Sequence, residues 1–469
     1  MASKSRWANT AEDAAVEVRL KKEKEEKKRL RAEKAAKAEQ ERQRAADAAR
    51  QQELRAQQEA EGDRPPAKRR KITPEREEGA PGGDADNTKL LRFEAGGWAP
   101  SRSVENYDKL NDIEEGAYGW VARAKETRTG RVVALKRLKL DTESAGTGLP
   151  ETGLREIQIL RDCSHQNIVA LREVVVGEDT SRIESVFLVL EFVEHDLKSI
   201  LEDMPEPFLA SEVKTLLLQL ASGVAYLHDH WILHRDLKTS NLLLNNRGRL
   251  KIADFGMARY VGDPPPKLTQ LVVTLWYRAP ELLLGTRTYG APVDMWSVGC
   301  VFGEILTRAP LLPGKNEVET LTKIFELCGI PTDESWPGFR RLPNARSLRL
   351  PSKSTAPAAT GSVIRARFPL LTAAGSALLS DLLSLNPDAR PTAQEMLRHE
   401  YFRQDPKPKH EAMFPTFPSK AGQERRRRHD TPNAPGRGQA AALGAVDFSG
   451  IFSGREKEER GAGFSLRMV

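Results

Sequence analysis

Three polar residues that lie close together in the sequence could do chemistry as a set. Asp236 can accept a proton from a hydroxyl group, Lys238 can neutralise an anionic group in motion, and Asn241 can give an oxygen ligand to a hard cation. All three belong to the segment His-Arg-Asp-Leu-Lys-Thr-Ser-Asn at residues 234–241. The combination suits transfer of a phosphoryl group, which needs a positioned acceptor and stabilised charge more than covalent chemistry by the protein.

A second carboxylate follows shortly afterwards. Residues 242–244 and 250–252 are short apolar runs separated by Asn-Asn-Arg-Gly at residues 245–248, which predicts a β-hairpin. A hairpin brings its two ends together, so Asn241 and Asp254 become neighbouring oxygen ligands that suit a magnesium ion. Asp254 alone, before Phe-Gly, would be an ordinary turn residue.

Groups that could hold a nucleotide lie upstream. Gly116 and Gly119 sit between two apolar segments, where glycine lets backbone N–H groups approach phosphate oxygens, although such glycines alone often only make a turn. Residues 131–136 predict a strand. Side chains two apart share a strand face, so the small Ala134 can admit adenine while Lys136 reaches the phosphates. A lone lysine on a strand would ordinarily be solvated.

The elements that must position these residues change character along the chain. Early segments alternate in the manner of strands, whereas residues 212–228 and 294–306 carry apolar residues at helical spacing. The sequence predicts an α+β fold with a small sheet-rich lobe followed by a larger helical lobe. Large apolar residues become frequent only after Tyr107.

The flanks are polar and predict a single folded domain. We expect a charged low-complexity region at residues 1–106 that is partly helical or disordered, a folded domain at 107–402, and a disordered tail at 403–469. The basic cluster Ala-Lys-Arg-Arg-Lys at residues 67–71 is either a nuclear import signal or plain solvated charge. The first alternative predicts a nuclear protein, with a cytoplasmic population also compatible.

Composition excludes several classes of protein. The formal net charge is +7, but the basic residues lie largely in tails where acidic residues are interleaved, so direct binding to nucleic acid is not expected. Cys163, Cys300 and Cys328 form no spacing typical of a disulfide framework or a zinc site. No apolar run is long enough to cross a bilayer, so no membrane association is expected.

Residues 107–402, with Ala279-Pro280-Glu281 following the motifs above, resemble a eukaryotic protein kinase domain. Residues 150–156 resemble the cyclin-binding helix of cyclin-dependent kinases, and residues 273–281 resemble their activation segment. The PITSLRE type is the nearest resemblance, and it is carried by four segments, at residues 113–116, 193–199, 231–234 and 463–466.

This resemblance implies the bilobal kinase fold and transfer of the ATP γ-phosphate to serine or threonine, in transcription, RNA splicing or the cell cycle. It assigns catalysis to Asp236, Lys238, Lys136 and Glu156, and magnesium binding to Asn241 and Asp254. It assigns nucleotide binding to Ile113, Glu114, Glu115, Gly116, Ala117, Tyr118, Gly119, Val121, Ala134, Lys136, Glu191, Val193, Leu243 and Asp254, with Leu190 behind the pocket.

The resemblance also implies regulation by a cyclin, of the L type for PITSLRE kinases. Glu156 would pair with Lys136 only when a cyclin moves its helix inward. Thr269 would be the activating phosphosite, with Arg155, Arg235 and Arg259 as the clamp on its phosphate. Val272 and Val273 resemble the segment that favours proline after the target residue of protein substrates.

Some residues depart from the family pattern. Glu114 stands where most kinases have the first glycine of the phosphate loop, and Ala117 replaces a threonine often used for inhibition, which leaves Tyr118 as the loop's switch. Residues 151–153 differ from the usual Ile-Thr-Ser, and Gly153 should cost about 1 kcal/mol relative to alanine inside a helix. Two rivals stay open: a pseudokinase scaffold, and an RNA-binding protein whose basic flanks carry the function.

Overall fold

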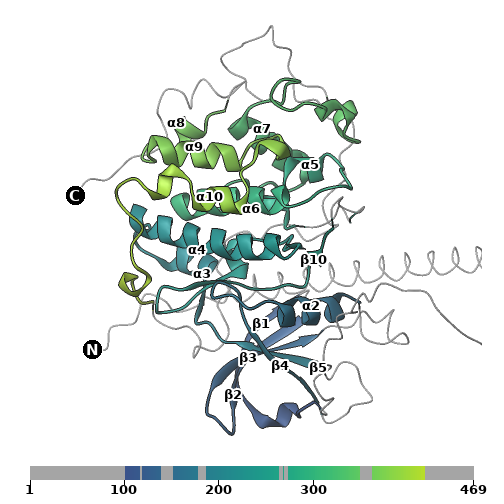
Figure 1. Cartoon of the computed structure of the whole chain (residues 1–469), viewed down its shortest axis with the longest axis vertical. Coiled ribbons are helices and arrows are strands. Elements are labelled where there is room, and N and C mark those ends of the chain that lie inside the picture. Colours follow the sequence, from purple (N-terminus) through teal and green to yellow (C-terminus); the bar gives the residue numbers. More distant parts are fainter. Residues whose placement is uncertain are drawn as a thin grey trace, which may run out of the picture. The chain divides into compact units, whose positions relative to one another are not determined.

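The computed structural model describes residues 101–116, 119–138, 151–177, 186–262, 268, 273–348 and 362–417 (Figure 1). The predicted N-terminal helical region, the basic cluster at residues 67–71 and the tail beyond residue 417 lie outside these residues. Within the described part, no helix is both long and apolar enough to cross a membrane.

The first lobe is built on one antiparallel sheet of five strands in the order β1-β2-β3-β5-β4. Its strands are β1 (Tyr107–Gly116), β2 (Gly119–Glu126), β3 (Val132–Leu138), β4 (Leu171–Val176) and β5 (Val186–Glu191). The strand predicted at residues 131–136 is therefore confirmed as β3. Gly130, at φ 69°, completes the turn from β2 because it tolerates the left-handed conformation.

The two faces of β3 serve different purposes. Val133 and Leu135 are buried in a small apolar cluster with Val189, while Ala134 and Lys136 point to the opposite face. Helix α2 (Glu151–Asp162) packs in the same lobe, as Figure 1 shows. The alternation of β3 therefore delivers Lys136 away from the small core.

The second lobe is helical, as predicted, and surrounds α6 (Pro292–Thr307), which is buried along most of its length. The predicted helix at residues 212–228 is confirmed as α4 (Ala210–Asp229). The remaining helices are α3 (Leu197–Asp203), α5 (Pro280–Leu283), α7 (Glu317–Cys328), α8 (Ile364–Arg367), α9 (Ala373–Leu382) and α10 (Ala393–Leu397). Short 3-10 turns include η4 (Thr239–Asn241), η5 (Leu275–Tyr277), η6 (Phe339–Arg341), η9 (Glu400–Phe402) and η10 (Glu411–Met413).

Short strands lie at the junction of the two lobes. β8 (Leu242–Leu244) and β9 (Leu250–Ile252) form the predicted hairpin, with Leu243 opposite Lys251. β6 (His195–Asp196) pairs with β8, and β7 (Ile232–Leu233) pairs with β10 (Arg259–Tyr260). These pairings hold both ends of residues 234–241 in place.

The folded part is longer than predicted at both ends. Residues 101–106, which we assigned to the charged flank, join the sheet lobe, where Arg102 binds Glu126 and Glu173 at 3.0 and 2.9 Å. The tail was predicted to begin at residue 403, but residues 403–417, named here the strap, pack on the helical lobe. Buried Lys214 donates to the carbonyl oxygens of Gln404 and Pro406 at 2.7 and 2.9 Å.

Candidate active site

Lys136 lies at the centre of an ion-pair network between the two lobes. Its Nζ lies 2.7 Å from Glu156 Oε1 and 2.8 Å from Asp254 Oδ1. Lys136 lies on β3, Glu156 lies on the buried face of α2, and Asp254 is the second residue after β9. The φ of Asp254 is 63°, which turns the chain sharply at that point. The structure therefore brings together three residues that are far apart in the sequence.

The network is charged in the folded protein. Burial would lower the pKa of Lys136, but the carboxylates of Glu156 and Asp254 outweigh it and raise that pKa. Burial also opposes ionisation of Asp254, yet Lys136 holds its pKa down at about 2. For Glu156, burial exceeds the attraction of Lys136 and raises the pKa. Because the lysine stays protonated at neutral pH, we treat Glu156 and Lys136 as an ion pair.

Asp236 is buried, and its carboxylate is held from several sides. Its Oδ1 accepts hydrogen bonds from Thr274 N at 3.0 Å and Thr274 Oγ1 at 2.8 Å. Its Oδ2 lies 3.0 Å from Lys238 Nζ. The side chains of Asp236 and Lys238, both predicted to be catalytic, are therefore in contact, and Thr274 is a further neighbour that the sequence did not single out.

The backbone of the same loop is fixed by Asp294 at the start of α6. The N–H groups of His234 and Arg235 donate to the two Asp294 oxygens, each at 2.9 Å, and His228 Nε2 lies 3.0 Å from Oδ2. Burial opposes ionisation of Asp294, but these hydrogen bonds keep its pKa below the usual value. Arg235 adopts φ 62°, a strained conformation that this anchoring maintains. The sequence did not reveal that Asp294 anchors this loop, because an acidic residue in the first turn of a helix is ordinarily exposed, whereas Asp294 is buried.

The two proposed metal ligands sit as the hairpin predicts. Ala253 N donates to Asn241 O at 2.9 Å, so Asn241 and the adjacent Asp254 end up side by side. Asn241 Nδ2 donates to Asp236 O at 2.8 Å, which leaves the amide Oδ1 without a donor among the described residues. One amide oxygen and one carboxylate fit a hard cation such as Mg²⁺. The described part of the chain holds no cluster of three or more acidic, histidine or cysteine ligands.

The apolar residues predicted to enclose adenine share one property. Ile113, Val121, Ala134, Leu190 and Leu243 are all half-buried, while their strand neighbours such as Leu242 and Leu244 are fully buried. Val121 lies opposite Lys136, and Ala134 lies opposite Leu190. Half-buried apolar side chains on facing strands are what a flat base requires.

The structure limits which backbone groups of the predicted hinge can bind adenine. Glu191 N donates to Ala170 O at 2.9 Å, so Glu191 can offer only its carbonyl group to a base. Val193, two residues further on, is buried. The side chain of Glu191 points elsewhere and pairs with Lys251 at 2.9 Å.

Parts of the predicted phosphate loop and activation segment stay untested. Ala117, Tyr118, Thr269 and Val272 lie outside the described residues, and nothing is described of the side chains of Glu114, Glu115, Gly116 and Gly119.

Arg235 and Arg259, two of the three predicted clamp arginines, both lie near Tyr289. Arg235 Nη1 donates to Tyr289 OH at 3.1 Å. Burial raises the pKa of Tyr289, and the charges of Arg235 and Arg259 reduce that rise. Arg155 instead pairs with Glu151, one turn away on the exposed side of α2.

Comparison with known proteins agrees with this geometry. The protein kinase domain family matches residues 107–402. Serine/threonine-protein kinase ppk23 of Schizosaccharomyces pombe is 54% identical over 319 residues, which cover 68% of this chain and 78% of that protein. Cyclin-dependent kinase 11B of Homo sapiens is 47% identical over 373 residues, 78% of this chain and 46% of that protein. Cyclin-dependent kinase G-2 of Oryza sativa subsp. japonica is 50% identical over 325 residues, 68% of this chain and 44% of that protein. The chain thus spans less than half of these last two relatives.

Proposed function

Because the chain belongs to the protein kinase family, and within it to the cyclin-dependent kinases of the PITSLRE type, we propose that its cleft transfers the ATP γ-phosphoryl group to serine or threonine side chains of proteins. One observation carries the proposal: the contacts run without a break across the cleft. Glu156 contacts Lys136, Lys136 contacts Asp254, and the hairpin links Asp254 to Asn241 and Asp236. A pseudokinase would be expected to lack at least one of these groups.

Each residue then has a role that follows from its chemistry. Lys136 holds the nucleotide phosphates, and Asp236 orients the acceptor hydroxyl and takes its proton. Lys238 Nζ also lies 3.2 Å from Thr274 Oγ1, so it is fixed beside the path of the transferred group. Asn241 and Asp254 would hold magnesium, which offsets phosphate charge when bound.

The geometry of Val273 supports a preference for proline directly after the target residue. Its φ is 63°, and its carbonyl oxygen accepts from Arg278 Nε at 3.3 Å and Nη2 at 3.1 Å. That carbonyl is therefore turned toward the protein and is already occupied. A substrate N–H at this place would lose its partner, whereas proline has no N–H to satisfy.

Regulation by a cyclin is supported by the two faces of α2. Glu156 lies on the buried face, while Leu154 is 50% exposed and offers an apolar side chain to a partner. A cyclin, of the L type by family resemblance, would cover Leu154 and hold Glu156 against Lys136. Phosphorylated Thr269 would add its charge to the Arg235 and Arg259 region. A nuclear role in transcription, RNA splicing or the cell cycle rests on the same resemblance.

The test is to purify the tagged full chain from its own cells and to identify the proteins that copurify. The complex is then assayed with matched Ser-Pro and Ser-Ala peptides. We expect a cyclin in the complex and at least tenfold faster phosphorylation of the Ser-Pro peptide. A cyclin complex without measurable ATP turnover would favour the pseudokinase, and equal rates on both peptides would exclude the role of Val273.

A further inference from the structure

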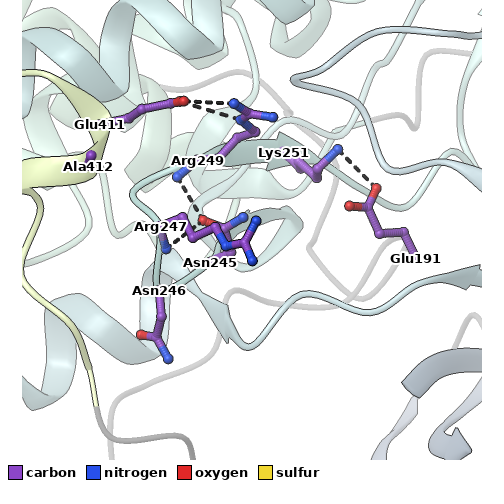
Figure 2. Close-up of a pocket in the computed structure, with 8 residues that line it drawn as sticks. All are labelled: Glu191, Asn245, Asn246, Arg247, Arg249, Lys251, Glu411 and Ala412. Atoms are coloured by element: carbon purple, nitrogen blue, oxygen red, sulfur yellow. Dashed lines mark hydrogen bonds and ion pairs between the residues drawn. The ribbon is translucent and has the colours of Figure 1, made fainter. Parts of the chain in front are cut away.

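A charged cavity of about 460 Å³ shares Glu191 with the predicted hinge but is lined by none of the charged residues of the catalytic network (Figure 2). Three parts of the chain line it: Glu191 at the end of β5, the β8–β9 turn with the start of β9, and the strap through Glu411 and Ala412. We name it the turn pocket. The strap follows the residues that match the kinase family, so this wall is an addition to the family domain.

The backbone that shapes the turn pocket is firmly held. Asn245 Oδ1 accepts from the N–H groups of both Arg247 and Arg249 at 2.9 Å. Gly248 has φ 76°, and a Cβ built there would lie 2.1 Å from Glu411 O. Only glycine therefore lets the strap approach the turn this closely, and the resulting wall is fixed before any ligand arrives.

The alternation of β9 puts the basic residues on one side. Leu250 and Ile252 are fully buried in the core, so Arg249 and Lys251 point to the opposite face, and Arg247 lies at the turn before them. Arg249 and Lys251 are two residues apart on this face, so their side chains start about 6.6 Å from each other. Arg247 lies outside the strand, at the turn, and its long exposed side chain can reach a ligand group that Arg249 holds.

The acidic residues of the pocket are already engaged. Glu191 lies 2.9 Å from Lys251 Nζ. Glu411 accepts from Arg249 Nη2 at 2.7 Å and from Nε at 3.4 Å, and Figure 2 shows the third guanidinium nitrogen of Arg249 pointing away from Glu411. Arg247 is exposed and forms no ion pair with any described residue. Three cations against two carboxylates leave one positive charge and unused N–H donors.

We propose that the turn pocket binds a phosphorylated serine or threonine side chain of a partner peptide, with Arg247 and Arg249 donating to the phosphate. Glu411 is a positioning residue, because it holds Arg249 side-on and leaves one guanidinium nitrogen to donate. A phosphate is favoured over a carboxylate because its three oxygens and its double charge can satisfy two guanidinium groups at once. The proposal is independent of the catalytic function, because neither arginine belongs to the cleft.

The test measures retention of the full chain, without ATP, on three degenerate peptide libraries that have phosphoserine, serine or aspartate at the central position. We expect at least tenfold greater retention on the phosphoserine library. Arg247→Ala should lower that retention at least tenfold, Arg249→Ala should lower it similarly, and the matched control Arg340→Ala, an exposed arginine on η6, should leave it unchanged.

Folding and catalysis provide the internal controls. Arg247→Ala should keep the thermal midpoint and the rate on the Ser-Pro peptide of the wild type, because Arg247 is an exposed turn residue. The proposal is overturned if Arg247→Ala retains as much phosphopeptide as the wild type, or if the serine or aspartate library binds equally well. Equal competition by a homopolymeric RNA would also overturn it, since the pocket would then respond to charge alone.

Discussion

The catalytic loop and helix α2 each bring a carboxylate to the cleft, but the two carboxylates are held in different ways. Asp236 accepts hydrogen bonds from Thr274 and Lys238, and the backbone just before it is tied to Asp294. Glu156 accepts from Lys136 alone among the described residues. One carboxylate is therefore built into the helical lobe, and the other depends on a single contact.

This difference teaches where regulation can act. A group held by several bonds is pre-organised and costs no rearrangement during the reaction. A group held by one contact can be displaced by a small movement of its helix, and a partner that favours the paired state shifts the population toward it. The geometry thus separates Asp236, which several hydrogen bonds fix, from Glu156, which depends on its one contact with Lys136.

The largest effect is expected from Asp236→Asn. The single amide oxygen of asparagine can still accept from Thr274, but the amide NH2 group cannot accept from Lys238, and asparagine cannot take a proton from the acceptor hydroxyl. We expect kcat to fall about 10³-fold, or roughly 4 kcal/mol in the barrier, with folding and nucleotide binding largely unchanged. Steady-state assays of the cyclin complex measure the rate, and retained activity would remove Asp236 from its role.

Asp294→Asn tests whether residues 234–241 depend on their backbone hydrogen bonds to Asp294 at the start of α6. The wild-type carboxylate accepts from two backbone N–H groups and from His228. One amide oxygen cannot serve all of these donors, so at least one is left unpaired. We expect a loss of about 2–3 kcal/mol in the free energy of unfolding, and slower catalysis because Arg235 loses its backbone anchor. Denaturant titration measures the loss, and a change below about 0.5 kcal/mol would contradict the anchoring role.

Glu156→Gln tests the region held by one contact. Removing the charge should weaken the hold on Lys136 and lower the activity of the cyclin complex about thirtyfold, or roughly 2 kcal/mol, while the free energy of unfolding changes by less than about 1 kcal/mol. The matched control is Glu151→Gln, the same change on the exposed side of α2. If Glu156→Gln destabilised the fold as much as Asp294→Asn does, Glu156 would be as important to the fold as the anchor of the catalytic loop, and the contrast between them would be lost.

Local sequence patterns predicted how four of the candidate site residues are placed relative to one another. The hairpin turn signal placed Asn241 next to Asp254, and strand alternation placed Ala134 and Lys136 on one face. These predictions succeeded because each depends on neighbours along the chain. The role of Glu156 came from the family resemblance, since nothing local to α2 specifies its partner.

Contacts set by tertiary packing were not predictable. Thr274 and Asp294 reach the catalytic loop from distant segments, and no periodicity marks them. The strap was wrongly placed in a disordered tail because its composition is polar and rich in proline. Phe414 and Phe417 were the available signal, since both contact Phe208 of the helical lobe, with ring centroids 6.3 Å apart in each pair.

The smallest effect is expected at Glu304, a residue of α6 that contacts the catalytic loop. Its carboxylate accepts from Tyr277 OH at 2.6 Å and from Thr239 Oγ1 at 2.9 Å, so it joins the activation segment and the catalytic loop to α6. Burial raises the pKa of Glu304 to about 6, although the two hydrogen bonds oppose the rise.

A raised carboxyl pKa means that the folded protein holds this proton more tightly than the unfolded chain. The associated stability is therefore present below pH 4.5 and is lost as pH rises through 6. Between pH 5 and 7 this group should remove about 1 kcal/mol from the free energy of unfolding. Glu304→Gln cannot titrate, so the stability difference between wild type and variant should narrow by that amount over the same range. Denaturant titrations at several pH values measure the difference, and a constant gap from pH 5 to 7 would show that the carboxyl group does not titrate there.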